Sequence, residues 1–83
     1  MSSFDVEQNQ ELDYQENEEN AIQFYKVLTE YLILKDKHEE PTDAKNLRLQ
    51  AEEALKEDQN NYSDAYSFIA TALKLFKAYN NLS

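Results

Sequence analysis

The stretch ENAIQFYKVLTEYLILKDKH, residues 19–38, indicates the fold class of this chain. Its apolar residues recur three and four positions apart, the spacing that brings side chains to one face of an α-helix. At about 100° per residue they cover about half of the helix circumference. Ile22 and Ile33 fall outside that arc and share a ridge, eleven residues apart. The apolar arc consists of Ala21, Phe24, Tyr25, Val27, Leu28, Tyr31, Leu32 and Leu34. The sequence therefore predicts a first helix at about 19–38.

Two further segments have helical spacing. The second helix, at about 42–58, follows Pro41, with Thr42 as its expected N-cap, and its apolar stripe is narrow and rich in alanine. The third, at about 64–79, has Ser63 as its expected N-cap and Asn80 as its expected end, and its apolar arc again covers about half of the helix. The chain has no Gly and a single Pro, a composition that favours long helices joined by short polar turns. We predict an all-α fold, a small three-helix bundle.

Charge is concentrated at the N-terminal end. The net charge is −9, yet the first twenty residues hold seven acids and no Lys or Arg, and the remainder has ten acids and eight bases. In a chain of 83 residues we expect one domain, a bundle over 19–83, preceded by an acidic arm over 1–18 that is either disordered or a short extra helix. The seven acids are Asp5, Glu7, Glu11, Asp13, Glu16, Glu18 and Glu19.

Composition argues against several classes of function. Without Cys the chain forms neither disulfides nor thiolate zinc sites, and without Gly it lacks the turn residue of an EF-hand loop. His38 is the sole histidine and lies beside a charged helix end, and nothing in the sequence suggests the orienting partner in a formed cleft that a general base needs. We therefore expect no catalytic residues, no metal site and no cofactor.

The near-neutral body gives no basic footprint for direct nucleic-acid binding. No apolar run is long enough for a membrane span and no secretory signal is evident, so we expect a cytoplasmic protein that does not bind membranes.

Two stretches resemble known helical modules. YSDAYSFIATALKL, residues 62–75, resembles the second helix of a tetratricopeptide repeat, with an aromatic residue and an acid before Ala65 and the pair Ala72 and Leu73 seven residues later. NEENAIQFYKVL, residues 17–28, is similar and also resembles an MIT-type three-helix module. The resemblance implies antiparallel helix pairs and binding of a peptide or protein, and it assigns no binding residues.

The three apolar faces differ in width. The first and third helices each present half a cylinder, whereas the second offers only a thin strip, so part of the wide faces is expected to stay uncovered in the monomer. The candidates for this apolar patch are Ile22, Ile33, Tyr66 and Leu73. We predict a non-enzymatic protein-binding module, such as an adaptor, an immunity-type factor or an inhibitor of a larger protein. The acidic arm would steer a partner with a basic surface toward the patch.

Two alternatives remain open at this point. Carboxylates in the arm could imitate nucleic-acid phosphates, which would make the protein a mimic that inhibits a DNA-binding enzyme. The wide apolar faces could instead pair with each other, which would make it a homodimeric structural or assembly subunit.

Overall fold

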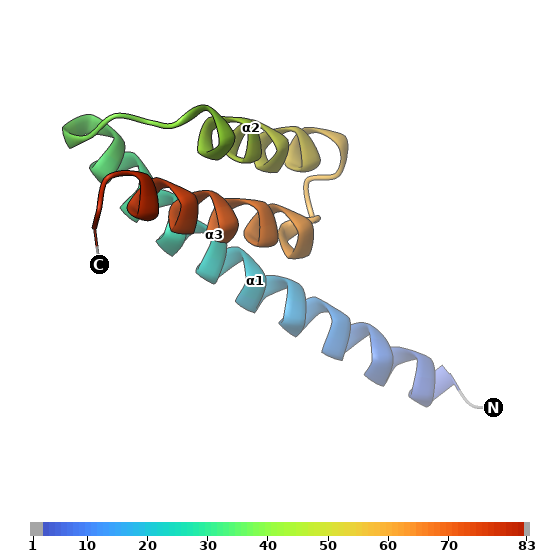
Figure 1. The fold of residues 1–83 in the computed structure, drawn as a ribbon. Coiled ribbons are helices and arrows are strands. Elements are labelled where there is room, and N and C mark those ends of the chain that lie inside the picture. Colours follow the sequence, from blue (N-terminus) through green and yellow to red (C-terminus); the bar gives the residue numbers. More distant parts are fainter. Residues whose placement is uncertain (1–2, 83) are drawn as a thin grey trace.

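The computed structural model describes the backbone of residues 3–82 and the side chains of residues 16–82. The chain forms three helices, α1 (Ser3–Lys37), α2 (Thr42–Glu57) and α3 (Tyr62–Tyr79), and no strand occurs within 3–82 (Figure 1). The predicted all-α, three-helix fold is confirmed. α1 begins at Ser3 rather than near residue 19, because its first part is rich in helix-forming Glu and Gln and contains neither Pro nor Gly. The side chains of Asp5, Glu7, Glu11 and Asp13 lie outside the described residues.

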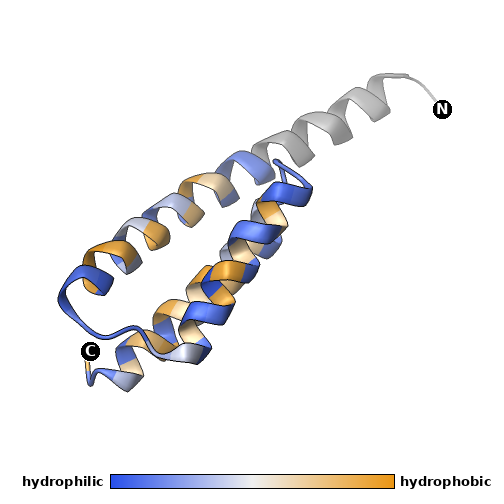
Figure 2. Ribbon diagram, turned by 90° about the horizontal axis from the view of Figure 1, so that it is seen from above, coloured by the Kyte–Doolittle hydropathy of each residue, from blue (hydrophilic) through white to orange (hydrophobic). Residues whose placement is uncertain are grey.

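The third helix occupies the middle of the fold. α3 packs against both α1 and α2, and it runs in the same direction as α1 and antiparallel to α2 (Figure 1). Seen from above, α1 lies beside the pair formed by α2 and α3 (Figure 2). This arrangement covers α3 on two sides, whereas α1 has only one covered side.

Two kinds of residue build the core. The four buried alanines, Ala44 and Ala51 of α2 and Ala65 and Ala72 of α3, leave room for close approach of these two helices. On the α1 side the space is filled by large rings, and Tyr31 lies 5.2 Å from Phe76 between ring centroids. The other large buried side chains are Phe24 and Ile69. The narrow alanine stripe of α2 thus suits a close helix pair rather than a broad core.

The helix starts differ from those predicted. Asn61, not Ser63, caps α3, because its side-chain oxygen accepts from the Asp64 backbone N–H at 3.4 Å while its amide donates to the Asp64 carboxylate at 3.1 Å. Thr42 likewise lies inside α2, whose N-cap is Pro41 without a side-chain cap. The extended backbone of Pro41 ends the loop, and its carbonyl accepts the first helical hydrogen bond at 3.0 Å.

The end of α3 shows how a chain without glycine stops a helix. Asn80 is the C-cap, and Asn81 takes the left-handed conformation with φ of 59°. The Leu82 N–H then donates to the Lys77 carbonyl at 2.8 Å and the Asn81 N–H to the Ala78 carbonyl at 3.3 Å, a Schellman motif. Leu82 packs against the core, so the chain beyond the helix is held in place.

A polar network joins α1 to the following loop and to α2. The Tyr31 hydroxyl donates to Glu40 Oε2 at 2.6 Å, and Arg48 donates to both carboxylate oxygens of Glu40, at 2.8 and 3.3 Å. Arg48 also reaches Glu52 at 2.8 Å. Burial and the hydrogen bond to Glu40 raise the pKa of Tyr31, so this phenol stays protonated and donates throughout the neutral range. The network fixes the position of α1 relative to α2.

Candidate interaction surface

Large apolar side chains are exposed mainly on α1. Among the described residues, four of the seven exposed large apolar side chains belong to this helix: Ile22 at 55%, Tyr25 at 51%, Leu32 at 46% and Ile33 at 52%. The other three are Leu49 of α2 and Leu75 and Tyr79 of α3. Together with the interleaved Lys26 and Thr29, the four side chains form a surface that we call the outer face of α1. Clustering of this kind, rather than single exposed apolar residues, is the feature that marks interaction sites.

The position of the outer face follows from helical spacing. Phe24 and Tyr31 point into the core and anchor the covered side of α1. Ile22, two residues before Phe24, and Ile33, two residues after Tyr31, are each rotated by about 200° from the nearby anchor and therefore point away from the body. Within residues 3–82 neither α2 nor α3 covers this side of α1.

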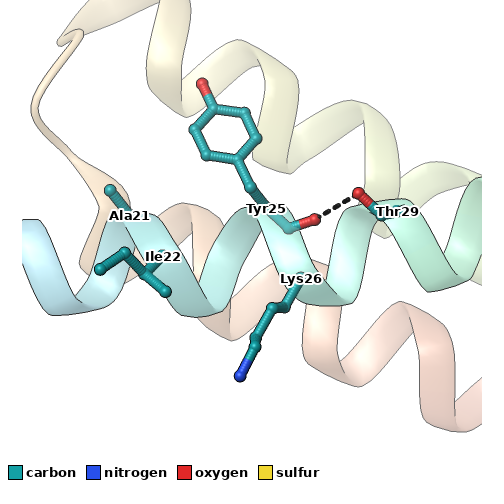
Figure 3. A pocket seen from close by; sticks show the side chains of 5 residues that line it. All are labelled: Ala21, Ile22, Tyr25, Lys26 and Thr29. Atoms are coloured by element: carbon teal, nitrogen blue, oxygen red, sulfur yellow. Dashed lines mark hydrogen bonds between the residues drawn. The ribbon is translucent and has the colours of Figure 1, made fainter.

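A shallow hollow lies within the outer face. Its lining is Ala21, Ile22, Tyr25, Lys26 and Thr29, all from α1, and Figure 3 shows α1 with the other helices behind it. Ile22 and Lys26 point to one side of the helix and Tyr25 points to the other (Figure 3). Because one helix supplies the whole lining, the hollow cannot enclose a small molecule as binding cavities do.

Tyr25 is exposed but held in position. Its ring stands edge-on to Phe24 at 5.1 Å and lies 5.9 Å from Tyr62, and the two tyrosine hydroxyls are 3.4 Å apart. The hydrogen bond with Tyr25 raises the pKa of Tyr62, so the Tyr62 phenol stays neutral well above pH 7. An aromatic side chain that is already ordered loses less entropy when a partner covers it.

Charge along α1 is polarised from one end to the other. Glu16, Glu18 and Glu19 are exposed before the apolar centre, and Lys35 and Lys37 are exposed after it. Near the centre, Glu30 pairs with Lys77 of α3 at 2.7 Å. The N-terminal end of α1 is therefore acidic, whereas its last turn combines the two lysines with the exposed Asp36.

The structure brings together only some of the predicted apolar residues. Ile22 and Ile33 are exposed on the outer face, whereas Tyr66 and Leu73 are half-buried and pack against the core. They are covered because α3 lies between two helices. Sequence reasoning missed Tyr25 and Leu32 as surface residues, because it assigned them to the core-facing arc. Both residues lie at the margin of the apolar arc, and that arc is wider than one neighbouring helix can cover. The width of the arc was therefore the signal in the sequence that its marginal residues would be exposed.

Other features of the described residues do not assemble into a catalytic or metal site. His38 is exposed, with its ring 6.5 Å from that of Phe76. Residues 16–82 contain no group of three or more side chains arranged to hold a metal ion. None of the described helices has the length and apolarity required to cross a membrane.

Comparison with known proteins gives no match from which a function could be assigned. No protein-family model, no curated protein and no solved structure matches this chain.

Proposed function

We propose that this chain is a non-catalytic protein-binding module whose contact surface is the outer face of α1. The observation that supports this function is the set of four large apolar side chains, each between 46% and 55% exposed, that a single helix presents to water. Apolar surface gains about 25 cal/mol per Å² when it is removed from water. A partner that covers the outer face gains that energy without any rearrangement of the helix.

The acidic arm gives the proposed partner its charge. Seven acids within the first nineteen residues create a negative field at one end of the molecule. Such a field accelerates encounter with a positively charged surface and weakens as salt screens it. The partner that fits is a protein with an apolar contact area beside a basic surface. An adaptor, an immunity-type factor and an inhibitor of a larger protein would all use these features.

Capture from host cells, with the full chain as bait, tests the proposed function. Ile22→Ser combined with Ile33→Ser removes two side chains of the outer face, and Leu49→Ser is the matched control, since Leu49 is 45% exposed on α2. We expect one or more proteins to be retained by the original chain and the control, lost with the double variant, and reduced by added salt. The same captured set from all three baits would refute the proposed surface. A set unchanged by salt and by removal of residues 1–17 would refute the steering role of the arm.

A nucleic-acid mimic remains the alternative function for the acidic arm. In the body, carboxylates are interleaved with bases, and Glu30 and Glu40 are paired with Lys77 and Arg48. This arrangement favours protein contact over imitation of a phosphate backbone. If a captured partner is a DNA-binding enzyme, competition between this chain and DNA for that enzyme would distinguish the two functions.

A further inference from the structure

We propose that Tyr25 and Tyr62 form an oxidative cross-linking site, at which a one-electron oxidant joins the two phenol rings and thereby fixes α1 to α3. The product is a 2,2′-biphenol, or dityrosine. The observation behind the proposal is a contact between two tyrosine side chains that are 37 positions apart in the sequence and belong to different helices. The proposal goes beyond the proposed function and does not rest on it, because it concerns a covalent bond within one chain.

The two tyrosine rings meet at the edges that carry their hydroxyl groups. The ring centroids of Tyr25 and Tyr62 are 5.9 Å apart, with 58° between the ring planes, whereas the hydroxyl oxygens are only 3.4 Å apart. Oxidised tyrosines couple through the ring carbon next to the one that bears the hydroxyl, so the reactive carbons flank this contact. In the biphenol the two hydroxyls also lie beside each other. A modest approach of one ring therefore converts the observed arrangement into that of the product.

The two rings differ in how firmly they are held. Tyr62 is half-buried and packs against the core, with its ring 5.9 Å from that of the buried Phe24. Tyr25 is 51% exposed, so an oxidant in solution reaches it directly. Reacting groups that the fold already holds in contact react far faster than the same groups at random encounter. The exposed ring is thus the point of attack, and the supported ring is the partner that captures the radical.

The other described tyrosines lack such a partner. Tyr31 is fully buried. Tyr79 is 56% exposed, much like Tyr25, but its hydroxyl donates to Glu39 at 3.0 Å. Neither Tyr66 nor Tyr79 contacts another aromatic ring within residues 16–82. In this part of the chain, one pair of tyrosines is therefore arranged for coupling.

Composition directs oxidation toward tyrosine. Cysteine and methionine are the side chains that oxidants usually consume first, and tryptophan is the other side chain that readily gives up a single electron. The chain has no Cys, no Trp and a single Met, at position 1, against six Tyr. Oxidising equivalents that reach the folded body therefore find few targets other than tyrosine.

The coupling reaction balances with peroxide as the oxidant. Each phenol gives up one electron and one proton and becomes a phenoxyl radical. The two radicals form a carbon–carbon bond, and each joined carbon then loses its hydrogen as a proton while the oxygen regains a proton, which restores both aromatic rings. The chain loses two hydrogen atoms in total. A haem peroxidase with hydrogen peroxide supplies the oxidising equivalents, and the peroxide is reduced to two water molecules.

The cross-link would stabilise the position of α1. α1 packs on the body of the protein through α3, and the bond would join these two helices near the start of α3. A covalent link between positions 37 apart restricts the unfolded chain, as a disulfide of the same span does. We expect the melting temperature of the cross-linked chain to rise by about 10 °C or more.

Treatment of the full chain with a haem peroxidase and hydrogen peroxide tests the proposal. A chain concentration of about 1 μM favours coupling within a chain over coupling between chains. We expect a product of monomer mass that is lighter by two hydrogen atoms and shows the fluorescence of a biphenol. Trypsin places Tyr25 in peptide 1–26 and Tyr62 in peptide 57–74. Because these peptides also contain Tyr14 and Tyr66, fragmentation of the linked pair by mass spectrometry identifies the joined residues.

Three variants separate the proposed pair from general tyrosine oxidation. Tyr25→Phe and Tyr62→Phe keep each ring but remove one phenol, and each should lower the yield of the monomer-mass product by at least about tenfold, since the remaining phenol has no partner in contact. Tyr79→Phe is the matched control, because Tyr79 is as exposed as Tyr25, and it should react like the original chain. Helical content measured by circular dichroism should be the same for all of them.

Several outcomes would overturn the proposal. They are an equal yield from Tyr25→Phe or Tyr62→Phe, a bond that joins other tyrosines, and cross-linking only between chains. A reaction that couples free tyrosine in a parallel sample but leaves this chain without an internal link would overturn it as well. A linked chain that melts at the same temperature as the original would refute the stabilisation of α1.

Discussion

Replacing Glu40 by Gln tests how strongly the network beneath the α1–α2 loop holds the fold. Glu40 accepts from Tyr31 at 2.6 Å and from Arg48 at 2.8 and 3.3 Å. The Glu40 and Arg48 side chains are only 11% and 15% exposed. Glu40→Gln keeps the shape and one acceptor oxygen, but it removes the charge that compensates the largely buried guanidinium.

The size of the effect follows from burial. Breaking a fully buried ion pair costs about 3–5 kcal/mol. Here the pair retains some contact with water, and Arg48 keeps its bond to Glu52 at 2.8 Å, so we expect a loss of about 2 kcal/mol. In a domain of this size that loss lowers the melting temperature by about 8–16 °C. Glu52→Gln is the matched control, since Glu52 binds the same arginine but is 53% exposed, and it should cost at most about 0.5 kcal/mol.

The pH dependence identifies the cause. Burial acts to raise the pKa of Glu40, but the hydrogen bonds from Arg48 and Tyr31 and the charge of Arg48 outweigh it and hold the pKa below its usual 4.5. A carboxylate with a lowered pKa stabilises the folded state above about pH 4.5, and this stability is lost as the pH falls through the folded-state value. Urea unfolding followed by circular dichroism should therefore show the original chain and Glu40→Gln converging in acid. An equal difference at neutral and acidic pH, or no difference at neutral pH, would refute this explanation.

Three further substitutions address the remaining local interactions, all measurable by urea unfolding. Tyr31→Phe keeps the ring against Phe76 but removes the donor to Glu40, and it should cost about 1–2 kcal/mol. Asn61→Ala should cost about 1 kcal/mol through loss of the α3 cap, whereas Ser63→Ala, at an exposed position, should change stability by less than about 0.5 kcal/mol; equal effects would refute the assignment of the cap. Asn81→Val should cost about 1 kcal/mol or more, because a β-branched residue resists the φ of 59°.

The helical periodicity of the sequence predicted most of the fold. Phe24 and Tyr31, seven residues apart, were assigned to the covered side of the first helix and are buried. The same rule placed Ile22 and Ile33 outside the arc, and both are exposed. Spacing succeeds here because each helix has one dominant covered side, so the angle around the helix decides which residues reach water.

The features that the sequence did not predict depend on where each helix lies in the bundle, and helical periodicity carries no information about that position. Tyr66 and Leu73 belong to an apolar arc as wide as that of α1, and they are half-buried only because α3 is the central helix. The order of the three helices in space, rather than the width of any one face, decides which apolar residues remain exposed. The cap at Asn61 was missed because Asn, Ser and Thr are all good caps, and only the backbone distinguishes them. The resemblance to tetratricopeptide and MIT-type helices stays a prediction.

The composition of the core relates the stability of the chain to its proposed function. Among the described residues eight side chains form the buried core, and four of them are alanines, which bury little apolar surface. The large apolar side chains that remain exposed, and would therefore gain most free energy on burial, lie instead mainly on the outer face of α1. A partner that binds only the folded chain stabilises it in proportion to the occupancy of that face. Association and folding are therefore coupled through Ile22 and Ile33, whether the occupant is a second copy or a foreign protein. Replacing these two residues should weaken binding and leave the fold of the isolated chain nearly unchanged.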